Sequence, residues 1–504
     1  MRILKCLKWL GFAFVVLATL LFLVVAFENY RGKRAWLAYK AEMEAKGERL
    51  DIESQRPPPV PDEQNFAMTP LLAPLLDYQF DPKTKQVQWR DTNASERPKN
   101  LFGWRRHAEF RSAGWRGGEF FDLVGCQQEL RAQTNSRDPQ IQALRATPPG
   151  RPAADLLFLL GLNAAELDEI RTASKWPGCS FKVHLDEGFH ALLPQLAVMK
   201  NFAGAFETKA LAELAAGNPD AAFADAQAAL AMSDALRTEP LLISCLVRIA
   251  NLEIALQPLW EGLARQQWTA AQIEQFQSRL HRVNLVEEMQ QSLRGERAFS
   301  IATLDAMKQD RKEMLETGEG GLQAGALRYM PSGWFYQNEL NIARMFQESL
   351  QAFDPARRTV DLTLANQTTG AFDMRLRGKH PYTLFASMLF PAINKTVAKT
   401  ARSQATLSLA VTACALERYR MDSGKYPEAI ENLVPRFIDK LPLDPVNGEA
   451  LHYRRQSDGR FLLYAVGLNR REDDGSVPRD QKGRVQQDQA EGDWVWQYPT
   501  GTAR

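Results

Sequence analysis

Nineteen consecutive residues near the amino terminus, Trp9 to Phe27, carry no charge. As a helix this run spans about 28 Å, close to the thickness of the hydrocarbon core of a bilayer. A cleaved signal peptide is the alternative, because Arg2, Lys5 and Lys8 form a basic region before the run. The run is long for a signal peptide and is followed by a poor cleavage site. The sequence therefore predicts an uncleaved transmembrane helix, with the lipid bilayer as a partner through Trp9–Phe27 and the body of the chain exported.

The composition of the rest of the chain is typical of a globular protein. The chain has 504 residues, of which 45% are hydrophobic and 24% are charged. Its mean hydropathy of −0.35 excludes a polytopic membrane protein, and its apolar content excludes a disordered one. At roughly 100–200 residues per domain, two or three domains are expected. The net charge of +2 gives no electrostatic reason to expect a nucleic-acid partner.

Shifts in composition divide the chain into five segments. They are a cytoplasmic stub with the anchor (1–30), a charged helix with a proline-rich spacer (31–61), a mixed lobe (62–150), a helical domain (151–400) and an α+β domain (401–504). The proline run at 57–61 predicts a stiff spacer that lifts the body off the membrane. In the mixed segment, Gln86–Trp89 and Glu119–Val124 are candidate strands, and the segment is either a small lobe or an excursion that packs on the helices.

The helical domain contains a clear helical hairpin. Helices are expected from Leu192 to Ala216 and from Ala221 to Leu236, with Gly217 in a left-handed conformation between them. Thr269 and Gln272 have the spacing of a capping box at the start of a later helix. Consecutive antiparallel helices predict a mainly α fold, resembling an α-solenoid with tetratricopeptide-like hairpins, although no regular 34-residue repeat is present. Such stacks usually bind a protein partner.

Two groups of residues could form a metal site or a disulfide. His184, Glu187 and His190 form the tightest polar cluster, and on a helix the last two would share a face and could bind a metal. The alternative is that Asp186 caps the helix that follows and that the other polar side chains are simply solvated. Cys126 and Cys179 both lie in the exported body, and the sequence leaves open whether they form a disulfide.

The last hundred residues predict one long helix on a small antiparallel sheet. Apolar residues recur at helical spacing up to Tyr419, and Gly424 is the expected left-handed cap. Strands are expected at Leu451–Arg454, Phe461–Val466 and Trp494–Trp496.

These residues resemble a known family. The run ALERYRMDSGKYP, the later prolines of Leu441-Pro442-Leu443-Asp444-Pro445, the strand ending in Gly467 and the triplet Gly492-Asp493-Trp494 are similar in order and spacing to the globular domain of type II secretion major pseudopilins. The resemblance implies a periplasmic α+β domain with a calcium ion in the loop after the second strand. The corresponding oxygen-bearing side chains here are those of Asn469, Glu472, Asp473, Asp474 and Asp488. A solvated acidic loop without a metal is the alternative.

Two departures from the family bear on function. About 370 residues separate the apolar amino-terminal helix from the pseudopilin-like domain, whereas pseudopilins join the two directly. Val16 stands where processed pilins carry a glutamate, which argues against polymerisation into a pilus. We therefore expect a non-catalytic scaffold or interaction module in a bacterial envelope assembly, at the inner membrane with its body in the periplasm. The alternative is an envelope metal-dependent hydrolase that uses His184, Glu187 and His190.

Overall fold

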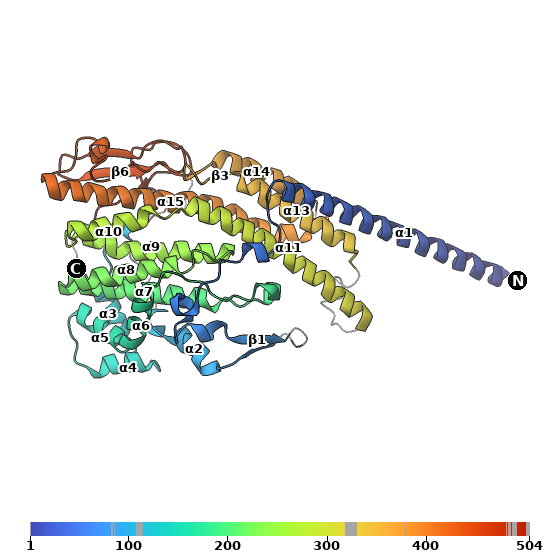
Figure 1. Cartoon of the computed structure of the whole chain (residues 1–504), viewed down its shortest axis with the longest axis horizontal. Helices are drawn as coiled ribbons and strands as arrows, with labels where there is room; N and C mark the ends of the chain where they lie inside the picture. Colours follow the sequence, from blue (N-terminus) through green and yellow to red (C-terminus); the bar gives the residue numbers. More distant parts are fainter. Residues whose placement is uncertain are drawn as a thin grey trace.

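The computed structural model describes residues 2–81, 84, 86–106, 114–317, 330–378, 380–479, 481, 485 and 491–499. Most of these residues are helical, as the sequence predicts (Figure 1). The helices are α1 (Arg2–Ala45), α2 (Thr92–Asn100), α3 (Leu123–Ala132), α4 (Pro139–Ala146), α5 (Pro152–Gly161), α6 (Ala164–Ala173), α7 (Pro194–Ala216), α8 (Pro219–Asp234), α9 (Leu242–Ala264), α10 (Ala270–His281), α11 (Leu285–Thr317), α13 (Ser332–Leu350), α14 (Leu362–Leu376) and α15 (Leu384–Ser423).

The strands form small antiparallel sheets. They are β1 (Tyr78–Asp81), β2 (Gln86–Trp89), β3 (Phe353–Asp354), β4 (Thr359–Val360), β5 (His452–Arg455), β6 (Phe461–Ala465) and β7 (Trp494–Val495). The strands β1 and β2 pair with each other, as do β3 and β4, and the order in the carboxyl-terminal sheet is β5-β6-β7. In that sheet His452 lies opposite Tyr464, and Ala465 lies opposite Trp494.

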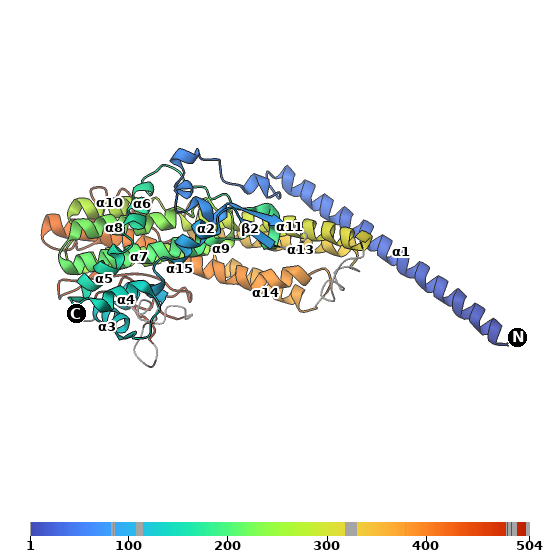
Figure 2. The ribbon, with the colours of Figure 1, turned by 90° about the horizontal axis from the view of Figure 1, so that it is seen from below.

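Helix α1 continues from the predicted anchor into the body without a break. Its apolar half, which contains Trp9–Phe27, projects away from the other helices and is exposed (Figures 1 and 2). It has the length and hydropathy of a membrane span or signal anchor. The second half packs on α13, where Trp36, Tyr39 and Met43 are buried with Leu340 in a small apolar cluster. The predicted charged helix is therefore part of the body.

The proline-rich segment also lies against the body, which differs from the predicted spacer. Val60 fills the space beside Gly178, where an added Cβ would lie 2.6 Å from a Val60 methyl carbon. Arg56 donates a hydrogen bond to the carbonyl oxygen of Val183 at 3.3 Å and pairs with Asp186. Arg56 precedes the prolines and Val60 lies within the run, and both contact the 178–186 segment, so the proline-rich segment does not separate the body from α1.

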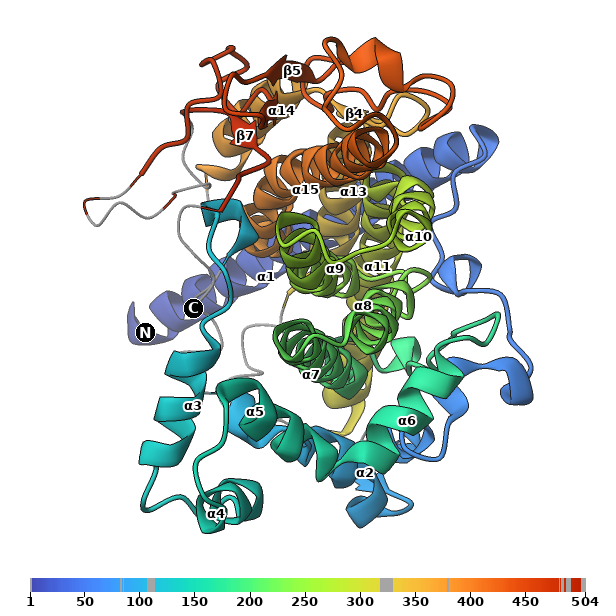
Figure 3. The ribbon, with the colours of Figure 1, turned by 90° about the vertical axis from the view of Figure 1, so that its left-hand side faces the viewer.

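The predicted helical hairpin is confirmed. α7 ends at Gly217, whose φ of 82° is left-handed, and α8 begins two residues later. α8 then packs on α9, and α7 contacts both of its successors (Figure 3). The capping box is present, because the Thr269 side chain accepts from the backbone of Gln272 and the Gln272 side chain accepts in return. These features are local in the chain, which is why the sequence reveals them.

The described residues between 62 and 150 pack on the helices as an excursion. The backbone N–H groups of Trp115 and Phe121 donate to Gln257 and Glu261 of α9, each at 2.7 Å. The strand predicted at Gln86–Trp89 is present as β2. The strand predicted at 119–124 is wrong, because Asp122 caps α3 there and the helix begins at the next residue.

One buried apolar cluster extends from Phe66 to Trp496. The boundaries placed near residues 150 and 400 therefore do not divide the core, and α15 runs across the second of them. Cys126 and Cys179 are thiols and are not joined by a disulfide.

The carboxyl-terminal segment has the predicted arrangement of a long helix on a small antiparallel sheet. α15 ends at Gly424, which has a φ of 76°. The strands β6 and β7 pack against α15, and all three strands lie within one residue of their expected positions at each end. On its other side α15 packs on α10, so this unit is built onto the helical region (Figure 3).

Candidate functional site

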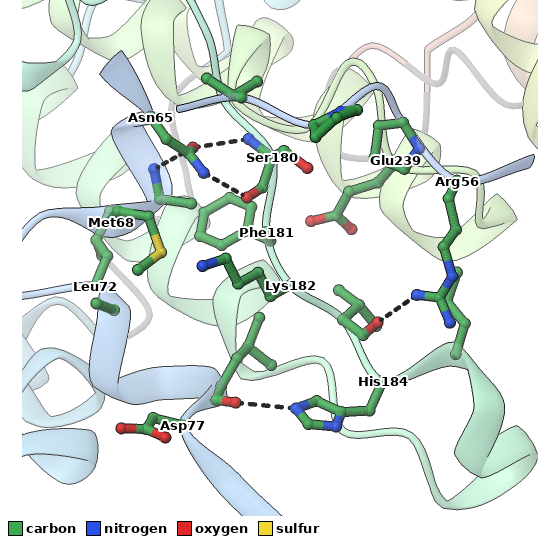
Figure 4. A pocket seen from close by; sticks show the side chains of 18 of the residues that line it. Arg56, Asn65, Met68, Leu72, Asp77, Ser180, Phe181, Lys182, His184 and Glu239 are labelled. Carbon is green, nitrogen blue, oxygen red and sulfur yellow. Dashed lines mark hydrogen bonds between the residues drawn. The ribbon is translucent and has the colours of Figure 1, made fainter. Parts of the chain in front are cut away.

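A cleft of about 700 Å³ lies between the 56–78 segment, the 180–186 segment and the turn that joins α8 to α9 (Figure 4). Asn65 holds two of these walls together: its side chain donates to the carbonyl oxygen of Ser180 and accepts from the Ser180 N–H, each at 2.9 Å. Met68, Leu72 and Phe181 contribute apolar surface to the walls. The cleft is therefore assembled from three segments that are distant in the sequence.

His184 lies at one end of this cleft with both ring nitrogens engaged. Its Nε2 is 3.1 Å from the carbonyl oxygen of Leu76, and its Nδ1 is 3.5 Å from Glu187. A carbonyl only accepts, so Nε2 carries a proton. The Tyr78 hydroxyl donates to Glu187 at 3.0 Å and its ring stacks on the imidazole. Burial raises the pKa of Glu187.

His190 lies near Glu187 but forms no hydrogen bond or ion pair with it among the described residues. The short helix that carries the cluster is interrupted at Gly188, which has φ 56° and ψ −132°, and the His190 ring stacks on Phe80 instead. The expected sharing of a helical face by Glu187 and His190 is therefore not found. Within the described ranges, no group of three or more His, Cys, Asp or Glu side chains has an arrangement suited to holding a metal ion.

The predicted calcium loop is brought together only in part. The side-chain amide of Asn469 donates a hydrogen bond to the carboxylate of Asp473 at 2.6 Å. Glu472 turns away to the Tyr464 hydroxyl, and Asp474 pairs with Arg454. Asp488 lies outside the described residues.

Asp493 also lies beside Asp473, although it was not among the ligands predicted from the sequence. One of its oxygens accepts from the backbone N–H groups of Asp473 and Gly475, at 3.0 and 2.8 Å. The other oxygen is buried without a hydrogen-bond partner among the described residues. Burial raises the pKa of Asp493, and the charge of Asp473 adds to that rise. The available signal was its place between Gly492 and Trp494, in the triplet that carries the resemblance.

Glu239 is the second residue of interest that was not predicted from the sequence. It lies in the turn between α8 and α9, lines the cleft and is 6% exposed. Its carboxylate accepts from the Ser244 hydroxyl and from the side-chain amide of Gln195. Burial raises the pKa of Glu239 to about 7. The only signal in the sequence is an acidic residue that shortly precedes the apolar start of a helix.

Comparison of the chain with known protein families, with curated proteins and with solved structures finds no match.

Proposed function

We propose that this chain is a bacterial inner-membrane protein with a periplasmic body, and that it acts as a non-catalytic scaffold in a type II secretion or pilus-like assembly. In this proposal the helical region and the pseudopilin-like domain bind protein partners, and α1 binds the bilayer. The observation that carries the proposal is the close packing of α1 on the body immediately after its apolar half.

The junction is formed by two glycines that let backbones touch. A Cβ on Gly32 of α1 would overlap the backbone of Gly333, and a Cβ on Gly333 would overlap the backbone of Glu28. The Gly333 N–H donates to the Asn29 side chain at 2.7 Å, and the Tyr382 hydroxyl donates to Glu28 at 3.0 Å. The junction begins immediately after Phe27, so a membrane-inserted α1 would hold the body next to the bilayer surface at a set angle.

Helix α15 runs from this junction to the opposite end of the body. Its 40 residues correspond to a length of about 60 Å. It begins two residues after Tyr382, at the end of the body near α1, and its other end lies at the far end of the body (Figure 1). The carboxyl-terminal sheet packs along it. A long helix of this kind would hold the domain that packs on it at a constant distance from the membrane, as a scaffold requires.

Photo-crosslinking in cells tests the partner. A photoreactive residue would replace exposed Arg454 in β5 or Phe158 in α5, with Glu44 of α1 as the matched exposed control. We expect adducts with secretion or pilus-assembly proteins from Arg454 or Phe158 and not from Glu44. Adducts from neither test position, or the same adducts from all three, would contradict the scaffold.

The calcium loop is the second part of the proposal. Asp473 and Asp493, with Asn469 beside them, are the residues that would hold the ion, and the buried unpartnered oxygen of Asp493 supports this choice. A hard cation prefers oxygen ligands of this kind. Calcium should raise the melting temperature of the wild type and of the Asp474→Asn control, but not of Asp493→Asn. Equal responses of both variants would contradict the site.

A further inference from the structure

The cleft that contains Glu239 has an unusual charge balance. The other charged side chains on its walls have opposite charges beside them: Arg56 pairs with Asp186, Arg90 with Asp77, and Lys182 with Asp62. Glu239 forms no ion pair with any residue in the described part of the chain, and its hydrogen-bond partners are neutral. It is also the most deeply buried acid of the cleft.

A buried carboxylate without a cation is costly, because its charge has lost water and gained no counter-ion. Ser244 and Gln195 supply hydrogen bonds, and the amino-terminal end of α9 favours negative charge nearby. These contacts explain why an acceptor stands at this position. They do not explain why this acceptor is an acid that can ionise, because a glutamine oxygen would accept the same bonds.

The surroundings of Glu239 indicate what kind of cation would fit. Figure 4 shows its carboxylate directed into the cleft, on the side where Phe181 lies. Met68, Leu72 and Leu241 add apolar wall, so the cleft suits a group with an alkyl chain. A bare metal ion would need several more oxygen ligands than one carboxylate and one hydroxyl.

We propose that this cleft binds an organic cation, whose ammonium or guanidinium group pairs with Glu239 while its alkyl chain packs against Phe181 and Met68. The lysine or arginine side chain of a partner polypeptide and a free alkylamine share this chemistry. The inference does not depend on the membrane anchor or on the pseudopilin-like domain, because its residues lie in neither.

Titration calorimetry on the full-length protein in zwitterionic nanodiscs tests the proposal. The probes are n-butylammonium, the neutral n-butanol, and a capped Ala-Lys-Ala peptide. The variants are Glu239→Gln and Asp77→Asn, which removes one negative charge from the rim of the same cleft. Thermal unfolding of each variant checks that it is folded.

We expect one butylammonium site per chain, with butanol at least tenfold weaker and Glu239→Gln at least tenfold weaker than the wild type. Asp77→Asn should change the affinity less than twofold. Affinity should rise from pH 6 to pH 8 as Glu239 ionises while the amine stays protonated. The titratable group beside Glu239 on the neighbouring segment is Cys179, whose pKa is raised by burial and by the Glu239 charge, so it stays neutral in this range.

The peptide identifies the source of the cation. Binding of the peptide at least tenfold tighter than butylammonium supports a polypeptide side chain as the occupant, and equal binding supports a free amine. Undiminished binding to Glu239→Gln, equal losses in both variants, or no binding of either cation would overturn the proposal.

Discussion

Among the residues that the structure describes, two helices are long and apolar enough to cross a membrane, and they lie in opposite environments. The most apolar window of α1 has a mean hydropathy of 2.8 and none of it is buried, whereas that of α9 has a mean hydropathy of 1.4 and 67% of it is buried. α9 lies in the middle of the helical layer (Figure 3), and α1 projects from the body (Figure 1). Hydropathy alone does not distinguish a core helix from a membrane span.

Charges on α9 explain the difference. Arg248 lies between Glu288 and Asp234, at 2.6 and 3.1 Å, and is 1% exposed. Glu253 on the same helix pairs with Arg116 at 2.7 Å. A bilayer offers no such partners, and the unpaired charges would be expelled from it. A protein interior can supply a partner from another segment for each charge, so an apolar helix with paired charges belongs in the core.

The largest expected effect comes from charging α1. Replacing Leu17 and Leu20 together by arginine should cost about 5 kcal/mol or more of membrane insertion. We expect the protein to leave the carbonate-washed membrane fraction while the body keeps its circular dichroism spectrum. Leu17→Phe is the control. A doubly charged variant that stayed in the membrane would show that the body binds the bilayer without α1.

The next largest effect is the loss of stability on removing the buried charge of Arg248 in α9. Arg248→Met leaves Glu288 buried without its cation, which should lower the free energy of unfolding by about 3–5 kcal/mol. Denaturant unfolding measures this loss. Arg436→Met removes an exposed pair with Asp422 and should cost about 1 kcal/mol or less. Similar losses for both variants would mean that the buried pair is no more important than a surface one.

The junction of α1 with the body gives an intermediate effect. Gly333→Ala adds a Cβ that overlaps the backbone of Glu28, and we expect a cost of about 1–3 kcal/mol. Trypsin should then cleave after Lys46 at least fivefold faster, because α1 detaches more often. Gly11→Ala is the matched control, since an added Cβ there meets nothing within 4 Å. An unchanged cleavage rate for Gly333→Ala would contradict a rigid junction.

The smallest effect, taken per pH unit, is the dependence of stability on pH that Glu239 causes at the start of α9. Burial raises the pKa of Glu239 to about 7, above the usual value of an unfolded chain. The folded state therefore binds the proton more tightly, and this contribution to stability is present below about pH 4.5 and is lost as the pH rises through 7. Glu239→Gln should remove about 1 kcal/mol of this decline per pH unit near pH 6 in pH-dependent unfolding curves. Parallel curves for variant and wild type would show that Glu239 does not titrate there.

Features that depend on neighbours in the chain were predictable. The capping box at Thr269, the left-handed Gly217 and Gly424, and the strands β5 to β7 lie where the sequence predicts them. The caps are decided by contacts within a few residues, whereas the strands pair over longer distances in the chain and were predicted from their composition and the turn residues between them. The 119–124 segment was misassigned for a related reason: its apolar residues suit a strand, but its backbone bonds to α9, more than a hundred residues away.

The candidate site was predictable only at the level of single residues. The sequence singled out the histidine cluster and the acidic loop, but the residues expected to bind a metal together do not all come together in the structure. Glu187 turns to Tyr78, and Asp473 meets Asp493 rather than Asp474, since both partners come from other segments. Spacing along the chain gives the direction of a side chain only where the helix or strand is regular, and Gly188 breaks that regularity.

The sequence by itself determined the apolar helix, the helical hairpin and the helix-on-sheet arrangement of the last hundred residues, because periodicity and caps act over one or two turns. Only the tertiary structure decided that α9 is a core helix, that the proline segment lies on the body, and that Glu239 faces Phe181 in a cleft. Those outcomes depend on which distant segments supply partners for a charge or an apolar surface. That information is distributed over the whole chain, and no local pattern contains it.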